Sequence, residues 1–117
     1  MQYRIARADL EQRAFGVGIA AGLFNGVQHG LADISLMFGE VQPGAEVGLH
    51  RHTYEELFVI HQGQAAFTID GTTVDVRAGD LVVIPAGAPH RFVNTGADVL
   101  QQTAVHAADA IAIEWLE

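Results

Sequence analysis

The stretch GAEVGLHRHTYEELFVIHQG, residues 44–63, decides the fold together with GDLVVIPAGAPHRFVN, residues 79–94. Taken together, the two segments place histidines and a glutamate at fixed distances from glycines and a proline. The spaced residues are Gly44, His50, His52, Glu56, Gly63, Gly79, Pro85, Gly87, His90 and Asn94. Three imidazoles and one carboxylate are enough to hold a divalent transition metal, so a metal site is the first hypothesis.

The spacing of the four candidate ligands suits strands. Side chains alternate across a strand, so His50 and His52 point to the same face. A tight turn over 53–55 lets Glu56 return from the next strand toward the same point, and His90 follows the stiff loop 85–89. A set this rich in nitrogen favours Fe, Mn, Ni, Cu or Zn over Mg or Ca. Neutral imidazole is the ligand form, so metal affinity should fall as the pH drops below the histidine range.

Working outward, turn signals recur every several residues between short runs rich in Val, Ile and Phe, which is typical of an all-β sandwich or barrel. The clearest hairpin is at Asp70-Gly71, because a two-residue type I′ turn needs a positive φ at both positions. Strands are expected near 3–8, 14–20, 33–42, 46–52, 55–61, 64–69, 72–77, 81–84, 90–95 and 98–106. Residues 110–116 could form a last strand or a short helix.

With both motifs intact at every defining position, the chain resembles the cupin superfamily, in the form of the compact single-domain bacterial cupins. The resemblance implies an antiparallel jelly-roll barrel (a double-stranded β-helix) with one divalent ion held inside by His50, His52, Glu56 and His90. It also implies that residues 1–117 form a single cupin domain whose core motifs span 44–63 and 79–94. The same residues could instead be a vestigial site in a metal-free cupin, but four intact ligands that are costly to bury unpaired argue against that.

Bulk properties exclude several classes. The 117 residues fit one domain, and the absence of cysteine excludes disulfides and thiolate metal sites. A net charge of −8 without a basic cluster argues against nucleic acid and anionic membranes as partners. The first residues do not resemble a signal peptide. The uncharged stretch Ala14–Ala32 contains too many glycines and polar residues for a membrane span. The expected location is cytoplasmic.

Other histidines and arginines have weaker interpretations. His106 shares the parity of Gln102 on the last long strand and could face the barrel as an acid–base group, although a surface or interface histidine is the commoner case. His61 has the parity opposite to Glu56 and is discounted as a ligand. His29 is expected on an exposed loop. Arg51 and Arg91 alternate with the ligands, so no arginine is expected inside the barrel to clamp a carboxylate, which weakens an oxalate-like assignment.

The preferred functional hypothesis is a metal-dependent enzyme acting on a small oxygen-rich organic molecule that chelates the ion. The resemblance implies dioxygenases, decarboxylases, isomerases or cyclases, and among these we favour a dioxygenase. One alternative is a non-catalytic sensor module that binds a metal or a small metabolite. Another is a metal-free sugar isomerase or epimerase, which the retained ligands disfavour.

A homodimer is expected because an open jelly roll leaves strand edges that need cover. The N-terminal segment or the final AIAIEWL, residues 110–116, could supply that cover, and Trp115 would suit an interface core. The stretch Ala14–Ala32 could cover the barrel mouth or lie between subunits; its sequence does not decide between the two.

Overall fold

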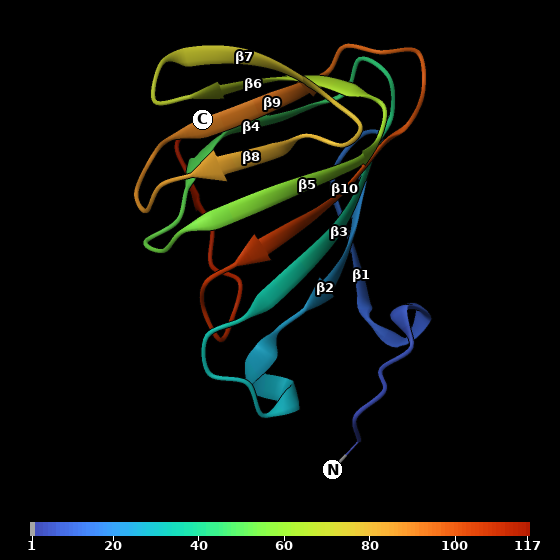
Figure 1. Ribbon diagram of the computed structural model, residues 1–117, viewed down its shortest axis with the longest axis vertical. Helices are drawn as coiled ribbons and strands as arrows, with labels where there is room; N and C mark the ends of the chain where they lie inside the picture. Colours follow the sequence, from blue (N-terminus) through green and yellow to red (C-terminus); the bar gives the residue numbers. More distant parts are fainter. Residues whose placement is uncertain (1) are drawn as a thin grey trace.

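Two antiparallel sheets face each other in a computed structural model that describes residues 2–117 (Figure 1). The elements, in chain order, are η1 (Arg7–Asp9), β1 (Glu11–Gly16), β2 (Ile19–Phe24), η2 (Gly26–His29), β3 (Ser35–Val41), β4 (Glu46–Arg51), β5 (Glu56–Gln62), β6 (Gln64–Ile69), β7 (Thr72–Arg77), β8 (Leu81–Ile84), β9 (His90–Asn94), β10 (Leu100–His106) and β11 (Glu114–Trp115). One sheet has the order β1-β2-β3-β10-β5-β8, and the other has the order β11-β4-β9-β6-β7. The predicted all-β jelly roll is confirmed.

Most predicted strands lie within two residues of the observed ones, and the exceptions fall before residue 25. The strand expected over 3–8 is wrong, because this stretch leads into the single turn η1. The strand expected over 14–20 is also wrong, because Gly16 and Gly18 take positive φ values of 136° and 78° and turn the chain from β1 into β2. The uncharged stretch 14–32 therefore holds an edge hairpin followed by η2.

The motif glycines serve turns, as their residue type predicts. Gly44, Gly63, Gly79 and Gly87 all have a positive φ, which L side chains rarely adopt. The Gly87 amide donates to the carbonyl of His52 at 2.8 Å, so a turn of the second motif fixes the backbone of a histidine in the first. The hairpin at Asp70-Gly71 has a positive φ at both residues, as a type I′ turn requires.

Asn94 bonds backbone and not the ion site. Its Nδ2 donates to the carbonyls of Val41 and Asp98, each at 2.9 Å, and its Oδ1 accepts from the Gly96 amide. The side chain thereby joins β9 to β3 and to the turn before β10. The last residue of the second motif therefore has a structural role.

The C-terminal segment lies across one end of the barrel. Its two-residue strand β11 pairs with β4, with Glu114 opposite Arg51 and Trp115 opposite His50. The Arg51 guanidinium donates two hydrogen bonds to Glu114, at 2.9 and 3.0 Å, outside the barrel. Of the two alternatives for 110–116, the strand is therefore the observed one, and it covers an edge of its own chain.

Aromatic rings fill the barrel next to the candidate site. Phe58, Phe67 and Phe92 are buried, with ring centroids 4.7 to 5.6 Å apart, and the Phe58 ring lies 6.4 Å from that of His90. Such packing holds the adjacent strands in a fixed geometry. Among residues 2–117, no helix is long and apolar enough to cross a membrane.

Candidate metal centre

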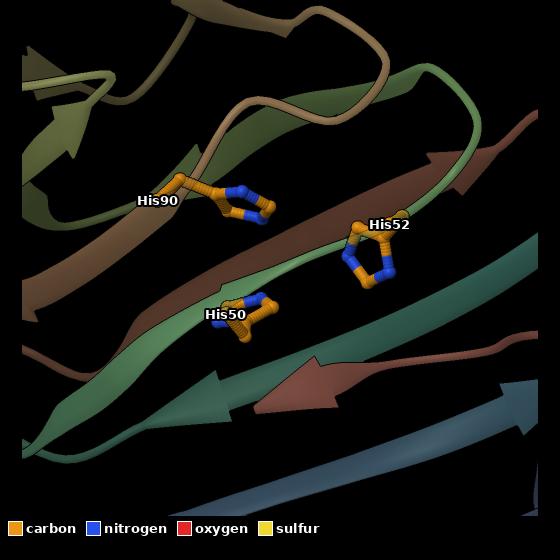
Figure 2. Close-up of side chains that lie close together, drawn as sticks. All are labelled: His50, His52 and His90. Carbon is orange, nitrogen blue, oxygen red and sulfur yellow. The ribbon is translucent and has the colours of Figure 1, made fainter. Parts of the chain in front are cut away.

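Strand pairing brings the predicted ligands together. His50 on β4 lies directly opposite His90 on β9, and Glu56 on β5 lies directly opposite His106 on β10. The side chains of all four residues, and that of His52, are at least 95% buried, in keeping with their inward direction. Figure 2 shows the rings of His50, His52 and His90 gathered around a common space, and one nitrogen of each ring lies within 4.8 Å of the others.

Backbone carbonyls fix the tautomer of each of these three rings. The Nδ1 atoms of His50, His52 and His90 lie 2.8, 2.6 and 2.9 Å from the carbonyls of Gly48, Ala112 and Ala88, respectively. A carbonyl only accepts, so Nδ1 must carry the proton and donate it. In the neutral ring Nε2 then holds a lone pair. This is the arrangement by which proteins orient histidines toward a metal.

In the neutral rings, the Nε2 lone pairs of His52 and His90 converge beside the Glu56 carboxylate. Nε2 of His52 and of His90 lie 3.2 and 3.0 Å from Oε1 of Glu56, but neither contact has the direction of a hydrogen bond. All three atoms are buried and without a hydrogen-bond partner. Acceptors facing acceptors in a buried site are costly unless a cation lies among them. The residues therefore fit a divalent cation.

The pKa values of His50, His52 and Glu56 are shifted by burial and by the contacts within the cluster. Burial lowers the pKa of His50 to about 4, so this ring stays neutral at physiological pH. Burial also opposes the charge on His52, but the contacts with Glu56 outweigh it and raise that pKa. Burial would raise the pKa of Glu56, yet the contacts with His106, His52 and His90 hold it well below its usual range. Glu56 is thus ionised and available as an anionic ligand.

The low pKa of His50 gives the metal-free protein a defined pH dependence. Between pH 6.5 and about 4 the unfolded chain binds a proton at His50 and the folded chain does not, so stability falls as the pH falls. The loss approaches roughly 3 kcal/mol at the lower limit. We expect the stability difference between wild type and His50→Asn to shrink by about this amount. Urea unfolding of both metal-free proteins at several pH values measures it, and a constant difference would contradict the neutral assignment of His50.

His106 faces the barrel and joins the cluster through Glu56, so the surface or interface position expected as the commoner case is wrong. Its Nε2 lies 3.0 Å from Oε2 of Glu56, so it contacts the carboxylate oxygen that His52 and His90 leave free. Its Nδ1 lies 2.7 Å from the hydroxyl of Tyr54. That hydroxyl also contacts the carbonyl of Ala112 at 3.2 Å and accepts from its amide at 3.1 Å.

Tyr54 is the functional residue of the cluster that sequence reasoning missed. It lies in the irregular segment between β4 and β5, where strand parity does not predict direction, and the sequence gives no sign that Ala112 would lie beside it. Through Ala112, the C-terminal segment contacts both His52 and Tyr54. Burial raises the pKa of Tyr54 to about 12, so its hydroxyl remains protonated.

The other histidines and arginines considered in the sequence lie away from the site. His61 is exposed and contacts Thr103 Oγ1 at 2.7 Å, as expected from its parity. Arg91 is exposed, and Arg51 pairs with Glu114 outside the barrel. His29 is half-buried against Phe24, with ring centroids 4.4 Å apart, so the expected exposed loop position is wrong in part.

A cavity of about 50 Å³ adjoins the cluster and is mostly apolar. Small side chains at Ala21, Gly39 and Ala104 leave this space inside the barrel, and Ile113 and Trp115 of the C-terminal segment lie at its wall. No Lys or Arg lies among the cavity-lining residues of the described chain. A bound molecule would therefore meet apolar walls on one side and the His/Glu cluster on the other.

Comparisons with known proteins agree with this geometry. The family model described as a cupin domain matches residues 37–106, which is more than half of the chain. Dimethylsulfoniopropionate lyase DddW of Ruegeria pomeroyi is 37% identical over 58% of this chain and 45% of its own length. An oxalate-binding protein of Thermotoga maritima is 37% identical over 56% of this chain and 55% of its own length. The chain thus spans about half the length of the curated relatives it matches.

Solved structures resemble almost the whole chain. The oxalate decarboxylase of Lactobacillus farciminis, in a formate complex, superposes with a TM-score of 0.85 and 28% identity. The match covers 93% of this chain and 34% of the decarboxylase. The structural similarity thus extends well beyond residues 37–106.

Proposed function

The chain belongs to the cupin domain family, and on that premise we propose that it binds one divalent transition metal and acts on a small molecule chelated to that metal. The ligands in this proposal are His50, His52, Glu56 and His90. The observation that carries it is the buried cluster of Nε2 atoms that converge beside an ionised carboxylate without a hydrogen bond to it. The imidazole-rich ligand set favours Fe, Mn, Ni, Cu or Zn.

A bound divalent ion would supply Lewis-acid polarisation of a chelating oxygen and, with a redox-active metal, a site for O₂. The residues of the chain orient the ligands, limit the access of water and supply a group for proton transfer. Three carbonyl acceptors hold the rings in the ligating tautomer, and the apolar cavity wall limits the access of water. His106 Nε2 lies 3.0 Å from Oε2 of Glu56, so His106 is the group that we assign to accept or release a proton.

The reaction class that we favour is a dioxygenase-type reaction on a chelated substrate. The ion with one carboxylate ligand has a net charge near +1, so a chelating monoanion would neutralise it inside apolar walls. With no cationic side chain at the cavity, a dianion such as oxalate would keep an unpaired charge. Decarboxylation, isomerisation and cyclisation remain alternatives on the same site. A sensor that binds without turnover is the alternative outside enzymes.

Oxygen uptake tests the reaction class. The protein is loaded separately with Fe(II), Ni(II), Cu(II) or Mn(II), and oxygen consumption is measured with catechols, β-diketones and oxo acids. We expect uptake with at least one pair and none with the His90→Ala protein. Turnover without oxygen consumption would contradict the dioxygenase assignment and indicate another reaction class. Tight binding of one compound without any turnover would favour the non-catalytic sensor hypothesis.

We also propose that the protein is a homodimer and that the outer face of the larger sheet is its interface. Two rows of outward residues cross this sheet in register: Leu36, Val105, Leu57 and Val83 in one, and Phe38, Thr103, Val59 and Leu81 in the other. Leu81 and Val83 are 61% and 69% exposed. The other six residues are partly buried, with the Arg7 guanidinium 4.5 Å from the centre of the Phe38 ring. A largely apolar face of this kind suits a second copy of the same face. The C-terminal segment pairs with β4 of its own chain, and Trp115 remains 47% exposed there.

An aspartate pair at this face should separate the subunits. Leu81→Asp/Val83→Asp places charges within the proposed interface, and we expect a monomer by sedimentation at micromolar concentration where the wild type is a dimer. Val74→Asp, on the other sheet and 41% exposed, is the matched control and should remain dimeric. A monomeric wild type, or a double variant that still dimerises, would contradict the proposed interface.

A further inference from the structure

Gln102 is a buried polar side chain without an assigned role. It lies on β10, on the same face as Ala104 and His106, and is 5% exposed. Its Oε1 atom is fully buried without a hydrogen-bond partner, and its side chain lines the cavity beside the His/Glu cluster. An unpaired buried amide oxygen is destabilising, so its position needs an explanation.

The surrounding strands leave room for this amide. Gln102 lies opposite Gly39 on β3, and a Cβ atom at Gly39 would lie 3.4 Å from Cγ and 3.6 Å from Nε2 of Gln102. A methyl group at position 39 would thus make only ordinary contact with the Gln102 side chain, which packs beside β3. The positions of Gln102 and His106 are four apart on one strand, roughly 13 Å between Cα atoms, with the small Ala104 between them.

We infer that Gln102 recognises a hydroxyl on the end of the substrate that faces away from the metal. This inference rests on the proposed function, because the other end of the substrate is the chelating one. It narrows the substrate to a short monoanionic chelator, such as a 2-oxo acid, whose mostly apolar chain ends in a hydrogen-bond donor. The monoanion neutralises the centre, the chain passes Ala104, and the hydroxyl donates to Gln102 Oε1.

A matched pair of 2-oxo acids tests the assignment. 4-Hydroxy-2-oxobutanoate and 2-oxopentanoate differ only in a terminal hydroxyl or methyl group, and titration calorimetry with the metal-loaded protein measures both. We expect the wild type to bind the hydroxylated acid about tenfold more tightly, and Gln102→Leu to lose this preference. Gln101→Leu is the control, because Gln101 is exposed on the outer face of the same strand, and it should keep the preference.

Thermal unfolding provides a second test. If Gln102 had a purely structural role, its replacement would lower the melting temperature. Replacing an unpaired buried amide with an apolar side chain of similar size should raise the melting temperature of Gln102→Leu. A lowered melting temperature, or an unchanged preference in Gln102→Leu, would overturn the assignment, and so would equal binding of the two acids by the wild type.

Failure of the metal hypothesis would give a result different from failure of the Gln102 assignment. If the metal-free protein binds both acids as well as the loaded protein does, the proposed function is contradicted whatever Gln102 does. If neither acid binds the loaded protein, the substrate class inferred here is overturned, while metal content measured on the same sample still reports on the centre.

Discussion

Replacing His90 with alanine is expected to remove the metal from the protein. His90 is fully buried, its Nδ1 is held by the Ala88 carbonyl, and its Nε2 faces Oε1 of Glu56. Changes to groups that only orient a ligand cost about 10- to 100-fold in metal affinity, so the loss of a direct ligand should cost more than about 100-fold. Elemental analysis of protein purified without an affinity metal should give one ion per chain in the wild type and close to none in the variant.

His61→Ala is the matched control for that experiment. It removes the same side chain from the outer face of β5, where His61 contacts Thr103, and should leave the metal content at one per chain. Circular dichroism of His90→Ala distinguishes metal loss from unfolding. A folded His90→Ala protein that keeps a stoichiometric ion would contradict the ligand assignment.

Metal removal is expected to lower the melting temperature on the order of 10 °C. A ligand present at about 100 times its dissociation constant stabilises the folded state by about 2.7 kcal/mol, and for a domain of this size that corresponds to a shift of this order. The physical source is the relief of repulsion among buried acceptors around Glu56. Scanning calorimetry before and after chelation measures the shift.

The shift should shrink as the pH falls, because protons compete with the metal for the imidazoles. His50→Ala, which lacks one proposed ligand, should show little change on chelation at any pH. The prediction is contradicted if the wild type is shown to contain the metal and chelation leaves its melting temperature unchanged. The metal would then not contribute to the stability of the fold.

Sequence spacing predicted the strands that carry the site and the convergence of its side chains. His50 and His52 could be placed on one face because strand parity is fixed. The same rule allowed His106 to face the barrel, but a surface histidine was the commoner expectation and it was wrong. The glycines and Asp70-Gly71 predicted turns because their backbone conformations are restricted to few residue types. These inferences depend on local geometry, which is why single-sequence reasoning reaches them.

Contacts between segments distant in the sequence could not be predicted in this way. The carbonyl of Ala112 fixes the tautomer of His52 and contacts Tyr54, but its place depends on how the last segment crosses the barrel end. The strand expected over 14–20 was wrong because the glycines at 16 and 18 place a turn there, and the one expected over 3–8 was wrong because that stretch leads into η1. Gln102 was recognisable by parity, but its missing partner is visible only in three dimensions.

The most direct test of the central claim is the position of the ion in crystals of the protein. Anomalous scattering recorded at the absorption edge of the metal found by elemental analysis should give one peak per chain. We expect that peak roughly 2.0 to 2.2 Å from Nε2 of His50, His52 and His90 and from Oε1 of Glu56, as for first-row ions bound by imidazole and carboxylate. A stoichiometric ion located elsewhere would contradict the account. So would crystals of untreated protein in which this cluster holds water and no ion.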